Sequence, residues 1–149
     1  MEVSSPLATE GEVLTHNLIM RILAAIAGVL LGLIFIALSS MYLFHFGPPP
    51  PPFPAGSPAA MFMGAVVPTG YFTFVKVCEL IGGVLVLFPA SRNYGLLLLG
   101  PIVANILAFN ICLVGNNAVM QPPVIAVTVL TVLAVLCGWR GFATPAKKA

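Results

Sequence analysis

One apolar run, Gly70–Pro89, constrains the fold most, because it is long enough to cross a membrane and yet carries Lys76 and Glu79. A membrane-spanning helix needs about 20 predominantly apolar residues. A charged side chain near mid-membrane costs roughly 2.5–3.5 kcal/mol, so two charges in one span require compensation. Because the two residues are three positions apart, they share a helical face and can neutralise each other. The run is therefore expected to be an inner helix of a membrane bundle, with this face turned toward the protein.

The composition supports an integral membrane protein over a soluble one. Of the 149 residues, 60% are hydrophobic and only 7% are charged, whereas a soluble domain carries far more charge. The formal charge of +2 is too small to indicate nucleic-acid binding, so the lipid bilayer is the expected partner. The three cysteines lie in apolar stretches and form no C-x-x-C pair, which favours small buried hydrophobes over redox groups: Cys78, Cys112 and Cys137.

The pattern of apolar runs predicts an all-α fold, an integral membrane four-helix transmembrane bundle in residues 18–142. The predicted spans cover about residues 18–44, 71–88, 94–114 and 122–139. Residues 1–17 form a polar tail in this interpretation, with Asn17 as a candidate cap of the first helix, and residues 143–149 form a basic tail.

The connection between the first two spans has an unusual composition. Gly47–Pro58 contains five consecutive prolines, which exclude a helix and favour a stiff, extended loop. The following stretch, Ala59–Val67, is apolar but too short to cross a bilayer. It is expected to form a short interfacial or re-entrant helix in the first external loop.

The distribution of basic residues predicts the orientation. With four spans, both termini and the turn between the second and third spans lie on one side. That side carries five basic residues, and the opposite loops carry none: Arg21, Arg92, Arg140, Lys147 and Lys148. The positive-inside rule places both termini in the cytoplasm, with Trp139 and Arg140 as an interfacial anchor.

The second and third spans form an antiparallel hairpin, so residues equally distant from Arg92 should lie at similar depth. Glu79 lies 13 residues before Arg92 and Asn105 lies 13 residues after it (92 − 79 and 105 − 92). The outer part of the first span is also polar. These positions predict one polar cluster in the outer half of the bundle, with His45 at its mouth: Ser39, Ser40, Tyr42, Lys76, Glu79, Asn105 and Asn110.

Two interpretations of this cluster remain open. It is either a structural network that holds the helices together or a pocket or proton path open to the outer face. Gly82 and Gly83 are predicted to let another backbone approach closely, and Pro101 is predicted to kink the third span. No spacing of ligands indicates a metal site, and His16 and His45 are poorly placed for haem.

The second span, GYFTFVKVCELIGGVLVL, resembles the DoxX family of small four-helix membrane proteins, whose pattern there is a glycine and an aromatic residue, K-x-x-E and then G-G. The segment GPIVANILAFN is similar to the next family segment, and the W-R ending of the fourth span also fits. The resemblance covers residues 19–142. It implies motif positions at Lys76, Glu79, Gly82, Gly83, Pro101 and Asn105. Asn110 departs from the family, since many members carry histidine there.

The resemblance implies an accessory subunit of a respiratory or other electron-transfer complex in the bacterial inner membrane, without catalysis or an intrinsic cofactor of its own. Other membrane subunits would be its partners, and a quinone or lipid would occupy the external polar pocket. The alternatives are a purely structural or assembly subunit without a ligand and a small oligomeric transporter. The apolar cytoplasmic half of the spans disfavours the transporter.

Overall fold

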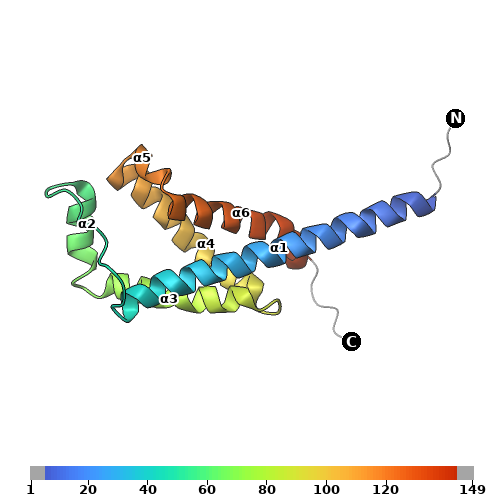
Figure 1. Cartoon of the computed structure of the whole chain (residues 1–149), viewed down its shortest axis with the longest axis horizontal. Coiled ribbons are helices and arrows are strands. Elements are labelled where there is room, and N and C mark those ends of the chain that lie inside the picture. The colour runs from blue at the N-terminus through green and yellow to red at the C-terminus, as the bar shows by residue number, and fades with distance from the viewer. Residues whose placement is uncertain (1–5, 144–149) are drawn as a thin grey trace.

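In the computed structural model, which describes residues 6–143 and the side chains of residues 14–115 and 118–137, all regular elements are helices. Four helices are long; a loop and the short helix α2 separate the first from the second, and shorter connections join the others (Figure 1). The elements are α1 (Pro6–Leu43), α2 (Pro58–Val66), α3 (Tyr71–Leu87), α4 (Arg92–Phe109), the π-helical turn η1 (Asn110–Val114), α5 (Asn116–Val119) and α6 (Pro122–Ala143).

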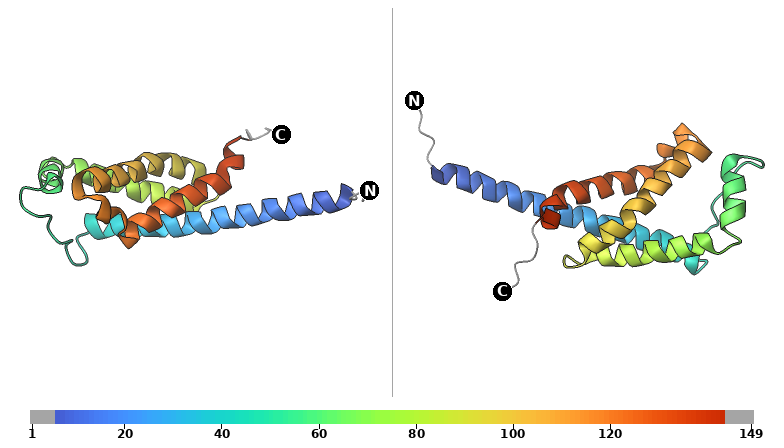
Figure 2. Two further views of the ribbon diagram at one scale, coloured as in Figure 1. Left: turned by 90° about the horizontal axis from the view of Figure 1, so that it is seen from above. Right: turned by 180° about the vertical axis from the view of Figure 1, so that it is seen from behind.

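The four long helices pack in a ring. The principal contacts join α1 to α3, α3 to α4, α4 to α6 and α6 back to α1. The N-terminal part of α1 projects beyond the other helices, and α2 stands at the opposite end of the molecule (Figures 1 and 2). We call that opposite end, which also carries the proline-rich loop of residues 44–57, the loop end.

Two helical stretches of the described chain are long and apolar enough to cross a membrane. They are Leu14–Leu43 of α1 and Arg92–Val114, which joins α4 to η1. The pair α2 and α3 would supply a third if it were one broken span, although the two helices are bent by 84° relative to each other. The apolar part of α6, Pro122–Cys137, is shorter. The chain is thus a helical protein with two or three candidate spans, fewer than the four that the sequence predicts.

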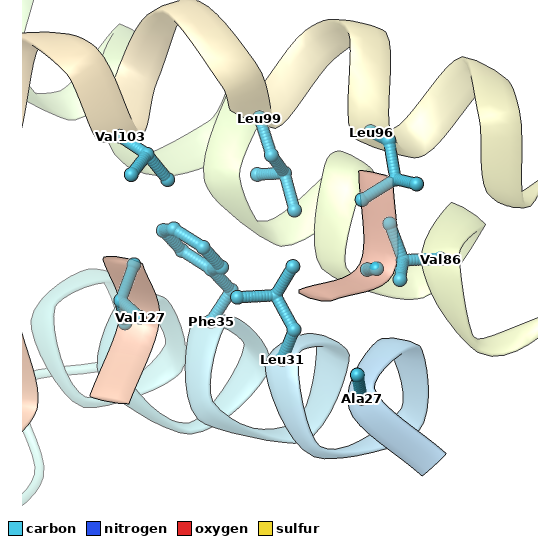
Figure 3. Close-up of a cluster of buried hydrophobic side chains, with 9 residues drawn as sticks. Ala27, Leu31, Phe35, Val86, Leu96, Leu99, Val103 and Val127 are labelled. Atoms are coloured by element: carbon cyan, nitrogen blue, oxygen red, sulfur yellow. The ribbon is translucent and has the colours of Figure 1, made fainter. Parts of the chain in front are cut away.

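An apolar core fills the centre of the ring (Figure 3). Three helices supply its largest fully buried apolar side chains: Leu31 and Phe35 of α1, Val86 of α3 and Leu99 of α4. Further core members come from α1, α4 and α6: Ala27, Leu96, Val103, Val127 and Ala134. Large apolar side chains also cover the outside, as expected where the surroundings are lipid tails, so close packing must supply most of the attraction between helices.

Glycines set the closest helix contacts. A Cβ atom added to Gly32 of α1 would lie 2.7 Å from the carbonyl oxygen of Gly83 in α3, so these two backbones almost touch. Gly82, the residue before Gly83, makes the close contact with α4. A Cβ atom added to Gly95 of α4 would lie 2.9 Å from the carbonyl oxygen of Gly82. The Gly82-Gly83 pair therefore faces α4 with one residue and α1 with the next, and it allows α3 to sit between them.

Two polar side chains stabilise the turn between α3 and α4 by hydrogen bonds. The Ser91 hydroxyl donates to the Leu85 carbonyl at 2.8 Å, and Arg92 Nε donates to the Val86 carbonyl at 3.4 Å. These bonds satisfy carbonyl groups that the end of a helix leaves without partners. Gly28 of α1 makes room for the arginine, because a Cβ there would lie 2.9 Å from Arg92 Nε.

At the loop end, α2 begins with a regular cap and is held by aromatic contacts. Ser57 Oγ accepts a hydrogen bond from the amide of Ala60, and Pro58 occupies the first turn, where its missing N–H costs nothing. The Phe109 ring lies 5.8 Å from Phe53 of the proline-rich loop and 5.6 Å from Phe62 of α2, measured between centroids. These three rings, the Phe109 cluster, attach the loop and α2 to the end of α4.

Several sequence-based boundaries were wrong. The first helix begins at Pro6, so Asn17 lies inside it and is no N-cap. Pro is favourable at a first helical position, so the helix begins there although the residues that follow are polar. The stretch Gly115–Gln121, which separates the predicted third and fourth spans, contains the short helix α5. The side chains of Trp139 and Arg140, and the residues Lys147 and Lys148, lie outside the described part of the chain.

Candidate functional site

The polar residues Ser39, Lys76 and Glu79 meet between α1 and α3. Lys76 Nζ lies 2.8 Å from Glu79 Oε2, and Ser39 Oγ donates to the same carboxylate oxygen at 3.0 Å. Ser39 is fully buried, and the Glu79 side chain is only 4% exposed. A buried carboxylate is stable only when charge and hydrogen bonds compensate it, and this site supplies both. We call these three residues the polar triad.

The local sequence explains why the triad forms. On α1 the buried positions Leu31, Phe35 and Ser39 recur at every fourth residue, so Ser39 continues the stripe that faces the bundle interior. On α3 Glu79 and Gly83 share the corresponding buried stripe. The contact of Gly83 with Gly32 of α1 brings the two buried stripes together. The polar triad lies where the stripes meet, on the side toward the loop end.

Aromatic rings border the triad on the loop side. Lys76 Nζ lies 5.2 Å from the centroid of the Phe72 ring, one helical turn away on α3. The Tyr42 ring of α1 meets Phe72 edge-on with centroids 5.0 Å apart. The exposed imidazole of His45 stacks on Tyr42 at 6.5 Å. From the buried carboxylate toward the exposed loop end, the groups are thus the Lys76 ammonium, the Phe72 ring and the Tyr42 phenol.

The structure does not bring the two asparagines to Glu79. Asn105 is exposed on α4, because it lies two residues, or about 200° of helix rotation, beyond the buried Val103. Asn110 donates through Nδ2 to the Ile106 carbonyl of its own helix at 2.7 Å. Equal distance from Arg92 along the chain predicts a similar depth but says nothing about this rotation. Ser40, predicted in the same cluster, is half-buried and adjoins Ser39 in the chain.

Pro101, predicted to pack and to kink the helix, lies exposed inside α4, which continues through it. Its ring nitrogen has no hydrogen to donate, so the carbonyl of Leu97 loses its usual helical partner. A π-helical turn follows α4 at η1, where the Gly115 amide donates to the Asn110 carbonyl.

Phe72 and Phe109 were missed as candidates from the sequence. Phe72 is four residues before Lys76, a spacing that places an aromatic ring beside an ammonium group, so the signal was available. Phe109 carried no comparable signal, because its partners lie in a loop and a helix far away in the chain.

The side chains of the polar triad can bind a hydrogen-bond acceptor. Among the described residues no group of three or more His, Cys, Asp or Glu side chains could hold a metal ion. Cys78, Cys112 and Cys137 are free thiols. What the triad offers is a lysine ammonium with several donors, a carboxylate that balances its charge, and an aromatic border.

Comparisons with known proteins identify no relative: no family model, no curated protein and no solved structure matches this chain. The resemblance to the DoxX family therefore stays a prediction that rests on the residues quoted for it.

Proposed function

We propose that this chain is an integral membrane accessory subunit of an electron-transfer complex, and that Lys76 presents a donor to a quinone or lipid head group. The observation that carries the proposal is the position of the Lys76 ammonium. It is paired with Glu79 at 2.8 Å, yet its side chain keeps 17% exposure, whereas the Glu79 side chain keeps 4%. An ammonium has three N–H donors, and Glu79 occupies one of them.

The chemistry of the site selects a class of ligand. Quinone carbonyls and lipid ester or phosphate oxygens accept hydrogen bonds, so a lysine donor suits both. Because Glu79 balances the charge of Lys76, the site favours an uncharged acceptor such as a quinone carbonyl over a phosphate anion. Phe72 and Tyr42 supply aromatic surface for a planar ring.

Two sequence arguments support the same proposal. The K-x-x-E positions of the DoxX-like motif are the two ends of the observed ion pair. The distribution of basic residues would place the loop end, and with it His45 and Tyr42, on the external side of a bacterial inner membrane with both termini in the cytoplasm. A four-span bundle in the membrane, with α2 lying at the interface, is part of this proposal.

The test combines ligand binding with purification of the host complex. Thermal unfolding of the protein in lipid nanodiscs would be measured with a short-chain ubiquinone and a short-chain menaquinone analogue. We expect a rise in Tm for the native chain that is lost in the double variant Lys76→Met, Glu79→Gln. Thr128→Val is the control, because the Thr128 hydroxyl bonds only its own helix, at the Val124 carbonyl. No rise with either quinone would refute the quinone site.

Gentle affinity purification from native membranes tests the accessory role separately. Co-elution with subunits of a quinone-dependent or haem-containing enzyme is the expected result, and mass spectrometry and the absorption spectrum of the eluate would identify that enzyme. Elution of the chain alone, colourless and as a defined oligomer, would exclude the accessory role.

A purely structural or assembly role is the second candidate, and one observation favours it. The buried carboxylate already has partners within the chain, since Ser39 and Lys76 both donate to Glu79 and Ser39 is fully buried. Hydrogen bonds of this kind stabilise a bundle without any ligand. The double variant distinguishes the candidates: a structural role predicts incorporation into the host complex with normal activity, and a quinone site predicts incorporation with lost activity. A transporter finds no support in the apolar core that fills the ring.

A further inference from the structure

The candidate span formed by α4 and η1 is covered much less by the rest of the chain than α1 is. Only 11% of the apolar window in Arg92–Val114 is buried within the chain, compared with 39% for the window in α1. The exposed positions recur at helical spacing and form one continuous face, which we call the α4 face: Tyr94, Leu97, Pro101, Ala104, Asn105, Ala108, Ile111 and Cys112.

One member of the α4 face does not suit contact with lipid. Asn105 lies near the middle of the candidate span, is exposed, and makes no hydrogen bond to any described residue. Three other polar side chains in the apolar helices avoid this: Asn110, Thr128 and Thr131 each bond a carbonyl one turn back in their own helix. A carboxamide left unpaired in hydrocarbon is costly, and asparagine in a span usually bonds across to a neighbouring helix.

The geometry points to a second copy of this chain as that neighbour: we propose that the α4 face is the contact of a homodimer in which the two Asn105 carboxamides bond each other. A carboxamide carries both a donor and an acceptor, so it is complementary to itself. Copies inserted with the same orientation are related by a twofold axis along the membrane normal. Such an axis places the two α4 helices parallel and each Asn105 at the depth of its counterpart.

The neighbours of Asn105 allow the approach that this pairing needs. Ala104 and Ala108 lie on the same face and are small, so two helix backbones can come close at this level. A different membrane protein would meet the same face only by supplying a polar group at the matching depth, whereas a second copy supplies it by symmetry. A single asparagine in an apolar helix contact fixes register and oligomeric state in the same way.

The decisive experiment is disulfide cross-linking in native membranes. In a background with Cys78, Cys112 and Cys137 replaced by alanine, Ala108→Cys is compared with Ile81→Cys, which lies on an equally apolar, 50% exposed position of α3. With copper phenanthroline as oxidant, we expect a disulfide dimer for Ala108→Cys and none above background for Ile81→Cys. Equal cross-linking at both positions, or cross-links from Ala108→Cys only to other proteins, would overturn the proposal.

A second measurement tests the asparagine itself. Energy transfer between labelled copies, followed as lipid is added, reports the dimer dissociation constant. We expect Asn105→Leu to weaken the dimer by about three- to thirtyfold, the range expected for a hydrogen bond between helices in a membrane. Asn105→Gln, which keeps the carboxamide, should restore part of the affinity. Undiminished association of the leucine variant would show that Asn105 does not form the contact.

Discussion

The hydroxyl of Ser39 and the carboxylate of Glu79 lie 3.0 Å apart and join α1 to α3 across 40 residues of sequence. Glu79 Oε2 is the shared acceptor of this bond and of the Lys76 ammonium, so the carboxylate depends on both helices. Ser39 is fully buried, so water does not compete for its hydroxyl. The stability of the pair and the proposed binding role are therefore linked.

Removing the Ser39 hydroxyl should loosen the bundle without unfolding it. Ser39→Ala is expected to lower the free energy of unfolding by about 0.6–2 kcal/mol, the range for one hydrogen bond between membrane helices. Reversible unfolding in mixed detergent micelles measures the change. Thr128→Val is the matched control, because it deletes a hydroxyl whose bond stays within one helix. Equal losses for the two variants would contradict an interhelical role for Ser39.

The ion pair should behave as a unit. Lys76→Met alone leaves the buried Glu79 carboxylate without its counter-charge, and Glu79→Gln alone leaves the ammonium without its own. Breaking a buried pair by removing one partner costs about 3–5 kcal/mol, whereas replacing both partners by neutral groups is often nearly neutral. We therefore expect the double variant to unfold at higher detergent concentration than Lys76→Met. A double variant as unstable as the sum of the two single variants would show that the charges do not compensate each other.

The close approach of α1 and α3 should tolerate no added volume. Gly32→Ala places a methyl group 2.7 Å from the Gly83 carbonyl oxygen and must push the helices apart. Overpacking of this kind costs about 1–3 kcal/mol. Gly64→Ala and Gly100→Ala serve as controls, because no heavy atom lies within 4 Å of a Cβ at either position. Each control should be neutral or stabilising, since alanine favours helix by about 1 kcal/mol over glycine.

The Phe109 cluster should control the order of the loop end. Phe109→Ala removes the ring that both Phe53 and Phe62 contact, and aromatic pairs contribute about 0.5–1.5 kcal/mol each beyond their buried area. We expect faster amide hydrogen exchange in α2, with protection of α3 around Glu79 unchanged. Phe74→Ala is the control, because Phe74 is 63% exposed on α3. Exchange that rises equally in α2 and α3 would mean that the cluster supports the whole bundle.

Much of this protein could be predicted from its sequence, because helical periodicity and hydropathy are local properties. The helical class, the approximate limits of α3, α4 and α6, and the break at the prolines follow from runs of apolar residues and from residues that cannot continue a helix. The spacing of Lys76 and Glu79 was also sufficient to predict that they share a helical face, since both lie on one helix.

The tertiary structure decided which residues of different helices meet. Equal distance from Arg92 suggested Asn105 as the companion of Glu79, yet the rotation of α4 turns Asn105 outward and the bond goes to Ser39. Helix rotation depends on where backbones can approach, and that was set by Gly82 and Gly83 facing two different neighbours. Depth follows from counting residues along one chain, whereas contact across helices depends on the packing of all of them at once.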